Sequence, residues 1–329
     1  MAELGFALIG CGKMGQSEAR LLDQIPGARL VAVCDVQVAA ADAFGKEMNV
    51  PAYAELGKVL ARPDVGAVII ATPNTTHPQP VMDAAAAGKH IFCEKPMALT
   101  VAACDQMIAA AEQHNVRLMV GQVLQLLPTF ARIVELFDSG VLGQPVAAQI
   151  TRIAGFPEGV APYRLTRQGA GGLLYEITVH EIDLLHRIFG PTRSVFAHID
   201  RAIVQTIDYE DMAQLQLRFQ SGASASIFES FGSAIPSYTG TIIATRGTLQ
   251  FDFRTGHISY RPTGGDESAE TVTGKDRENG YLRELRSFTE WVLERKQPLL
   301  TAHEGRAAIA VVEAAYTSAR TGQAVDVAP

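Results

Sequence analysis

Residues Ala7-Leu8-Ile9-Gly10-Cys11-Gly12-Lys13-Met14-Gly15 predict a strand, a glycine turn and a helix, because an apolar run leads through three spaced glycines into a helical pattern. Gly10 permits a tight turn, Gly12 lets the backbone approach a pyrophosphate, and Gly15 lets the helix pack closely on the strand. Glycines at this spacing also occur in turns of the same fold that bind no nucleotide. Their position between a predicted strand and a predicted helix favours a dinucleotide site.

An acidic residue indicates which dinucleotide binds. Asp35 lies twenty residues beyond Gly15 and ends the predicted second strand, where its carboxylate can accept hydrogen bonds from the adenosine ribose. A 2′-phosphate there would meet the negative charge of Asp35, and residues 36–41 contain no Lys or Arg to offset it. The sequence therefore predicts NAD as the cofactor in preference to NADP. The helix start at Lys13 and Met14 is expected to hold its phosphates.

Short apolar runs alternate with helical patterns as far as Gly121, which predicts an α/β Rossmann domain with a parallel, doubly wound sheet. The runs are nearly continuous in apolar residues, as expected for strands that are covered on both faces. The predicted strands are 4–10, 30–34, 51–53, 65–71, 90–93 and 117–120, and the predicted helices are 14–24, 36–48, 79–87 and 101–114.

After Gly121 the pattern changes to that of an α+β domain. Helices are predicted at 128–139, 172–189, 281–294 and 302–320, and a strand at 145–153. From 194 to about 273 apolar and polar residues alternate, which indicates a large, mainly antiparallel sheet. The polar face of that sheet is either exposed to solvent or covered by another copy of the chain. We expect one domain over residues 1–121 and a second over 122–329.

The composition excludes several classes of function. The 329 residues carry a formal net charge of −7 and contain no run of Lys or Arg, so no nucleic-acid partner is expected. The apolar stretches reach only strand length, whereas a membrane span needs roughly 20 residues. The four cysteines are single and lack metal-ligand spacing, and Met1-Ala2-Glu3 lacks the features of a secretory signal. We expect a cytoplasmic protein with reduced thiols.

Polar residues cluster just after the predicted fourth, fifth and sixth strands, at the edge of the sheet where ligands bind. These residues are Thr72, Pro73, Asn74 and His77, then Glu94-Lys95-Pro96, and then Gln122. We expect the cofactor to contact this set.

Together with the glycine turn, the Glu94-Lys95-Pro96 tripeptide resembles the Gfo/Idh/MocA family (glucose–fructose oxidoreductase, inositol dehydrogenase and a rhizopine-catabolism protein). The resemblance extends over essentially the whole chain, and the tripeptide is its most specific mark. It implies a two-domain NAD(P)-dependent oxidoreductase that acts on sugars, cyclitols and related polyols. It also implies that the second domain binds substrate and forms a homodimer or homotetramer through its sheet.

The resemblance gives Lys95 a catalytic role. The lysine of the family tripeptide lies near both the nicotinamide ribose and the substrate, where an ammonium group can stabilise negative charge on the reacting oxygen. The alternative is a surface lysine that pairs with Glu94.

The segment 171–183 resembles the glycine-rich helix start of the family and its acidic–histidine pair. On an α-helix Glu176, His180 and Asp183 would share one face. His180 matches the acid/base histidine of the family, and imidazole titrates near neutral pH. Glu176 stands where aspartate is usual and is expected to orient His180 or to bind a substrate hydroxyl. The alternatives are a packing histidine and a metal site that includes His186, although we expect no metal.

Other positions depart from the family pattern or extend it. Gln125 and Leu126 stand where an arginine and an aromatic residue are frequent, which argues against an anionic substrate. Arg164 follows Tyr163 in a pair that resembles an aromatic–arginine contact with substrate, and packing within its loop is the alternative. Tyr281 opens the penultimate helix and is a further candidate for substrate contact, although helix capping or core packing would also explain it.

The expected function is reversible hydride transfer between NAD and a secondary alcohol of a sugar, cyclitol or related polyol. His180 would take the hydroxyl proton, Lys95 would polarise the oxygen, and Glu176 would position His180 or a neighbouring hydroxyl. Two other functions are consistent with the same scaffold: a reductase of a non-sugar substrate and a non-catalytic protein that senses NAD(H).

Overall fold

The computed structural model describes residues 3–275 and 278–328, and the chain forms two compact units. The first unit comprises Met1–Val123 and Gly280–Arg306, and the second comprises Leu124–Asn279 and Ala307–Pro329. The chain therefore passes from one unit to the other three times. The predicted boundary after residue 121 lies close to the first of these crossings. The predicted second domain, 122–329, includes the segment 280–306, which the structure assigns to the first unit.

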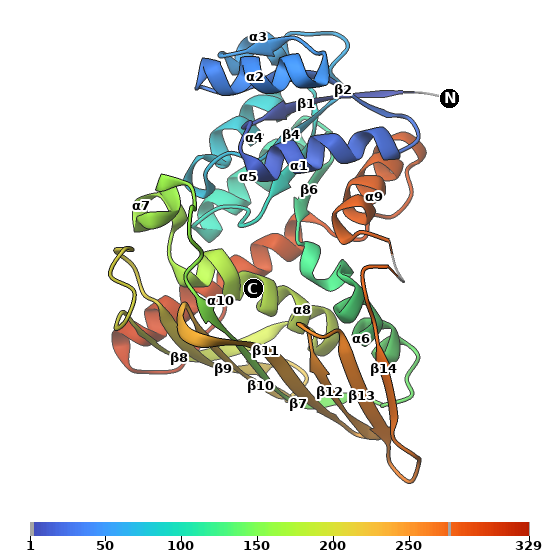
Figure 1. Ribbon diagram of the computed structural model, residues 1–329, viewed down its shortest axis with the longest axis vertical. Coiled ribbons are helices and arrows are strands. Elements are labelled where there is room, and N and C mark those ends of the chain that lie inside the picture. The colour runs from blue at the N-terminus through green and yellow to red at the C-terminus, as the bar shows by residue number, and fades with distance from the viewer. Residues whose placement is uncertain (1–2, 276–277, 329) are drawn as a thin grey trace. The chain divides into compact units, whose positions relative to one another are not determined.

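The first unit contains a parallel sheet with helices packed around it (Figure 1), and its strand order is β3-β2-β1-β4-β5-β6. Its strands are β1 (Leu4–Ile9), β2 (Ala28–Cys34), β3 (Ala52–Tyr53), β4 (Ala67–Ile70), β5 (His90–Glu94) and β6 (Leu118–Gly121). The order reverses between β1 and β4, and ligands bind such sheets beyond the carboxyl ends of the strands at this point. The predicted parallel, doubly wound sheet is confirmed.

The helices of the first unit begin and end where the local sequence favours it. They are α1 (Lys13–Leu21), α2 (Val38–Met48), α3 (Leu56–Leu60), α4 (Pro78–Ala86), α5 (Val101–Gln113) and α9 (Gly280–Glu294). The Oγ1 atom of Thr100 caps α5 by accepting a hydrogen bond from the N–H of Ala103, and α4 begins at a proline. Helix α1 ends at Leu21, and a 3₁₀ turn over Leu22–Gln24 completes the predicted helix 14–24.

Helix α9 completes the core of the first unit although it lies far along the chain. It packs beside α1 and against β5 and β6. The ring of Phe288 lies 6.0 Å from that of Phe6 and 5.9 Å from that of Phe92, measured between ring centroids. All three rings are completely buried, so α9 covers apolar surface that belongs to β1 and β5.

The second unit is built on a nine-stranded sheet with the order β14-β13-β12-β11-β7-β10-β9-β8-β15. Its strands are β7 (Pro145–Gly155), β8 (Thr192–Asp200), β9 (Met212–Phe219), β10 (Ser224–Ser230), β11 (Gly232–Ala244), β12 (Gly247–Asp252), β13 (His257–Pro262), β14 (Ser268–Thr271) and β15 (Val325–Asp326). Strands β7 and β10 pair in parallel, and the other described pairs are antiparallel. The predicted, mainly antiparallel sheet is confirmed.

Helices cover one face of this sheet. They are α6 (Pro128–Asp138), α8 (Val179–Phe189) and α10 (Ala302–Thr321), which begins in the first unit and continues into the second. The short α7 (Arg167–Ala170) packs on the 3₁₀ turn over Pro162–Leu165 instead. In β9 the apolar residues point to the core while Gln214, Gln216 and Arg218 are exposed on the opposite face. The alternation predicted for 213–219 is therefore confirmed.

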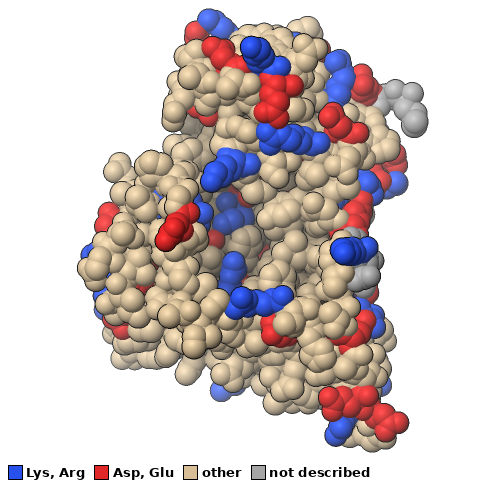
Figure 2. All heavy atoms as spheres, in the orientation of Figure 1, with Lys and Arg blue, Asp and Glu red and all other residues tan. Residues whose placement is uncertain are grey.

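The surface carries charges of both signs. On the face seen in Figure 2, acidic and basic side chains both occur, and most of the surface in view carries neither. Among the described residues, no helix combines the length and apolar character that a membrane crossing requires.

Candidate cofactor and active site

The three glycines of the turn between β1 and α1 have different structural roles. Gly10 has a φ of +99°, and a Cβ atom there would lie 2.6 Å from the carbonyl oxygen of Ala71. A Cβ atom on Gly15 would lie 2.3 Å from the carbonyl oxygen of Gly10. A Cβ atom on Gly12 would meet nothing within 4 Å, and Gly12 begins α1 without a side-chain cap. Close packing thus requires Gly10 and Gly15, while Gly12 leaves the helix N-terminus open to a phosphate.

The carboxylate of Asp35 lies beside this turn. The N–H of Cys11 donates to Asp35 Oδ2 and the N–H of Gln37 donates to Oδ1, each over 2.8 Å. Each oxygen keeps a second lone pair that can accept a hydrogen bond from a ribose hydroxyl. On the other side of Asp35, Val36 and Val38 are exposed, so the adjoining surface is apolar rather than cationic. The open helix start and this anionic acceptor fit NAD.

A buried histidine joins the loops that follow β4 and β5. The Nδ1 atom of His77 lies 2.9 Å from the carbonyl oxygen of Pro96, and its Nε2 atom lies 2.9 Å from that of Thr72. The ring is completely buried, and this burial lowers the pKa of His77 below its usual value. Both ring nitrogens are therefore engaged by the backbone. We predicted that His77 contacts the cofactor. The structure instead buries its ring between the loops that follow β4 and β5, where it holds the two loops together.

The neighbouring residues of these loops differ in exposure. Thr72 and Pro73 are half-buried, and Asn74 is buried in a 3₁₀ turn over Asn74–Thr76. The turn is held by the hydroxyl of Thr76, which donates to the carbonyl oxygen of Pro73 over 2.7 Å. Thr72 and Pro73 remain accessible for the predicted cofactor contact.

Glu94 and Lys95 lie at the carboxyl end of β5. The Oε2 atom of Glu94 accepts a hydrogen bond from the backbone N–H of Lys95 over 3.1 Å. Lys95 is half-buried and is linked to Pro96 by a cis peptide bond. After β6, the amide of Gln122 is 1% exposed, and neither of its side-chain atoms has a hydrogen-bond partner among residues 3–275 and 278–328. Buried side-chain amides nearly always have a hydrogen-bond partner, so Gln122 keeps a donor and an acceptor available for a bound molecule.

In the second unit the predicted helix 172–189 has an irregular beginning. Gly171 and Gly172 have φ values of +88° and +127°, which favour glycine. A π-helix over Leu174–Thr178 follows and leads into α8. The prediction of one regular helix was therefore wrong in its first turns, and π-helical turns are frequent at functional sites.

A buried carboxylate that the sequence analysis missed holds this irregular start. Glu210 accepts hydrogen bonds from the N–H of Leu173 over 3.0 Å, from the guanidinium of Arg167 and from the hydroxyl of Tyr316. A Cβ atom on Gly172 would lie 2.6 Å from its Oε1 atom. The close approach of Glu210 thus explains why a glycine precedes the π-helix.

Two predicted substrate residues lie together in the second unit. The Nε atom of Arg164 donates to Glu176 Oε2 over 2.8 Å, and Arg164 Nη2 lies 2.5 Å from the same oxygen. The backbone of Arg164 is fixed in turn, because its carbonyl oxygen accepts a hydrogen bond from Tyr209. His180 follows in the first turn of α8 and is half-buried, with its Nδ1 atom inside the protein.

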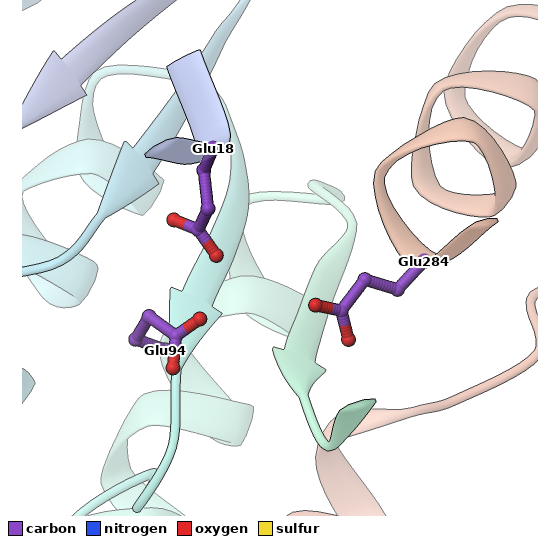
Figure 3. A group of neighbouring side chains, drawn as sticks. All are labelled: Glu18, Glu94 and Glu284. Atoms are coloured by element: carbon purple, nitrogen blue, oxygen red, sulfur yellow. The ribbon is translucent and has the colours of Figure 1, made fainter. Parts of the chain in front are cut away.

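The alternative metal site on this helix is not formed. Asp183 Oδ2 accepts a hydrogen bond from the side chain of Gln125 over 2.9 Å, and His186 Nε2 lies 2.9 Å from the hydroxyl of Thr192. The described residues bring together metal-ligating atoms of three side chains at one place only, Glu18, Glu94 and Glu284 in the first unit (Figure 3).

A second buried hydrogen-bond network, which was not predicted from the sequence, joins α8 and the π-helix to strands of the nine-stranded sheet. Glu181 accepts hydrogen bonds from Arg152 over 2.9 Å and from the hydroxyl of Tyr238 over 2.5 Å. Glu229, from β10, accepts a hydrogen bond from Thr178 of the π-helix. Burial, together with the charge of Glu181, raises the pKa of Glu229 well above its usual value. The sequence offered one signal, because Glu229 occupies an inward position in an alternating strand.

Tyr281 does not belong to the second domain as predicted. It is the second residue of α9, is half-buried, and lies in the first unit. Substrate contact by Tyr281 stays a prediction, but the residue would make that contact from the first unit.

Known proteins are similar to this chain over most of its length. Residues 4–122 match a family described as an oxidoreductase family with an NAD-binding Rossmann fold, and residues 130–250 match the Gfo/Idh/MocA C-terminal domain. A 2,7-anhydro-N-acetylneuraminate hydratase of Mediterraneibacter gnavus is 30% identical, over 77% of this chain and 68% of its own. A myo-inositol 2-dehydrogenase of Thermotoga maritima is 28% identical, over 94% of this chain and 95% of its own.

A solved structure is also similar to the whole chain. GenD2 from gentamicin A biosynthesis, solved in complex with NAD, is 26% identical and superimposes with a TM-score of 0.88 over 100% of this chain and 97% of its own. The predicted NAD cofactor is confirmed by the family match. The chain belongs to the Gfo/Idh/MocA family of NAD-binding oxidoreductases.

Proposed function

We propose that this enzyme transfers a hydride between NAD and a secondary alcohol of a sugar, cyclitol or related polyol. One observation carries the proposal: the carboxyl edge of the parallel sheet collects the open helix start at Gly12, the acceptor Asp35 and the Glu94-Lys95 turn. The names of relatives, such as the myo-inositol 2-dehydrogenase, support the substrate class.

The proposed roles follow from the chemistry of each side chain. NAD, when bound, accepts or returns the hydride. Lys95 stabilises negative charge on the substrate oxygen through its ammonium group. His180 takes the hydroxyl proton through its imidazole ring, which titrates near neutral pH in its ordinary state. Glu176 binds a neighbouring hydroxyl, because its carboxylate is held in place by Arg164.

A screen of polyols and sugars with NAD, followed by NADH absorbance, tests this proposal. We expect Lys95→Met and His180→Asn to lower kcat by about two to four orders of magnitude, the range for loss of an acid–base group or an oxyanion donor. The matched controls are Lys58→Met and His303→Asn, which change exposed residues outside the site. Full turnover in His180→Asn would refute the assigned role.

A second candidate function follows from the relative that is named a hydratase. In that case the enzyme would add water to its substrate and return the cofactor to its starting state. Product analysis with substoichiometric NAD separates the two functions. A dehydrogenase accumulates NADH in proportion to product, whereas a hydratase forms product without net NADH.

We also propose that the chain forms a homodimer or homotetramer through the open face of the nine-stranded sheet. Two large apolar side chains, Phe196 and Ile243, are 41% and 50% exposed there. Light scattering after size exclusion should give a multiple of the 35.3 kDa chain mass, and Phe196→Glu should reduce it. A monomeric wild-type protein at micromolar concentration would contradict the proposal.

A further inference from the structure

Three buried carboxyl groups converge inside the first unit. Glu18 comes from α1, Glu94 from the end of β5 and Glu284 from α9 (Figure 3). Their side chains are 0%, 8% and 0% exposed, and one oxygen of each lies within 4.8 Å of the others. Glu94 belongs to the Glu94-Lys95 turn of the proposed active site, whereas Glu18 and Glu284 lie outside the Glu94-Lys95-Pro96 motif.

Glu18 shows what this cluster lacks when its members are ionised. Neither oxygen of Glu18 has a donor partner among residues 3–275 and 278–328, and Glu94, the group that it faces, is itself an acceptor in its ionised form. An ionised carboxylate that is buried without a donor is strongly disfavoured, and close carboxylates cannot all ionise. Burial, followed by the charge of Glu94, raises the pKa of Glu18 well above its usual value.

Glu94 links the cluster to the turn that carries Lys95. Its Oε2 atom accepts the N–H of Lys95 over 3.1 Å, and its Oε1 atom would lie 3.2 Å from a Cβ atom on Gly121. The carboxyl group is therefore confined between the backbone of β6 and that of Lys95. A donor from Glu18 would fix the remaining side of this carboxyl group.

We propose that the Glu18–Glu94–Glu284 cluster retains a shared proton at neutral pH, and that an O–H···O bond from Glu18 holds Glu94 against the backbone of Lys95. Glu18 and Glu284 are then positioning residues. Their importance for turnover rests on the function proposed for Lys95, whereas the shared proton does not.

The surrounding titratable groups are consistent with a site that holds a proton. Burial, followed by the charges of Glu94, Cys104 and Glu18, raises the pKa of the Cys93 thiol well above its usual value. Burial lowers the pKa of His77, and the charges of Glu94 and Lys95 both act on its ring. The Cys93 thiol is therefore neutral and supplies no positive charge that would stabilise ionised carboxylates in the cluster.

Infrared spectroscopy of the full-length protein tests the proton directly. At neutral pH the wild type should show a protonated-carboxyl C=O band that weakens in Glu18→Gln. Absorption from Glu229 in the second unit is common to both proteins and cancels in the difference. The control Glu47→Gln, at an exposed helix glutamate, should leave the band unchanged. Glu284→Gln supplies the same comparison if Glu18→Gln does not fold.

The pH dependence of unfolding gives a second, independent measure. The folded wild type holds a proton that the unfolded chain has released above the ordinary glutamate pKa, so its stability falls as pH rises through neutrality. Glu18→Gln lacks this proton. The ratio of the two unfolding constants should therefore change by about tenfold per pH unit. Parallel pH curves, or an unchanged infrared band, would refute the shared proton.

Two further outcomes separate this inference from its alternatives. Stoichiometric metal in the dialysed enzyme, together with a lower unfolding temperature after chelation, would show that a cation rather than a proton neutralises the cluster. If the proton is present, Glu18→Ala should lower kcat while Glu18→Gln, which retains a donor, restores it. Equal kcat values for wild type and Glu18→Ala would refute the positioning role. The infrared and unfolding measurements need no substrate, so they stand even if no polyol is oxidised.

Discussion

Replacing Asp35 with asparagine should change both the affinity and the choice of cofactor. Each carboxylate oxygen accepts one backbone N–H and can accept one ribose hydroxyl. Hydrogen bonds to a charged group contribute about 1.5–3 kcal/mol, so loss of the carboxylate should raise the Kd for NADH by about 10- to 100-fold. The like charge that opposes a 2′-phosphate is lost as well. NADPH should therefore bind more tightly to Asp35→Asn than to the wild type, while NADH binds more weakly. The ratio of NADPH affinity to NADH affinity then rises by a larger factor than the NADH affinity falls.

Fluorescence titration of NADH and NADPH against wild type and Asp35→Asn measures both effects. Stability should change little, because the N–H of Gln37 is exposed to water and only that of Cys11 is partly buried, which limits the loss to about 1 kcal/mol. Asp42→Asn, at an exposed position of α2, is the matched control. An unchanged NADH affinity in Asp35→Asn, or equal affinity of the wild type for NADH and NADPH, would refute the reasoning.

Three further predictions concern single sites. Gly10→Ala should lower the unfolding free energy by roughly 1–3 kcal/mol, because φ is +99° and the Cβ atom would lie 2.6 Å from a carbonyl oxygen; an unchanged melting temperature would contradict this. Burial lowers the pKa of His186 to about 4, below its unfolded value of 6.5. The free energy of unfolding should therefore fall as pH drops from 6.5 to about 4, because only the unfolded chain takes up the proton. Denaturant titrations should show a smaller fall in His186→Gln. Burial raises the pKa of Cys11 and Cys34 to about 12 and 11, so a thiol reagent at about pH 8 should react with the native protein slowly and with four thiols after unfolding.

The sequence was sufficient for features that depend on local pattern. A few consecutive residues are enough to predict the backbone conformation and the buried side chains of such features. Examples are the glycine turn, the near-continuous apolar strands and the alternation at 213–219. The structure confirms these elements, with shifts of a few residues at their ends. The predicted cofactor followed from the same local information, because only α1, a 3₁₀ turn and β2 separate the glycine turn from Asp35.

Features that depend on distant contacts could not be predicted in this way. The pattern of 281–294 shows an amphipathic helix but not which core it joins, and Phe288 proves to pack on β1 and β5. The spacing of Glu176, His180 and Asp183 indicates one helical face only if the helix is regular, and the π-helix changes that register. Arg164 and Gln125 come from other segments, and no local pattern indicates that they pair with Glu176 and Asp183.

The late position of α9 has a consequence for how the chain is made. Domains generally fold as units during synthesis, beginning at the N-terminus. Here the helix that covers Phe6 and Phe92 is translated only after every strand of the nine-stranded sheet except β15. The first unit begins to be synthesised first but is completed almost last. The apolar surface that residues 280–306 cover stays uncovered until that segment has been translated. A nascent chain arrested before Gly280 would be a client for chaperones and proteases, although all six strands of its parallel sheet had already been synthesised.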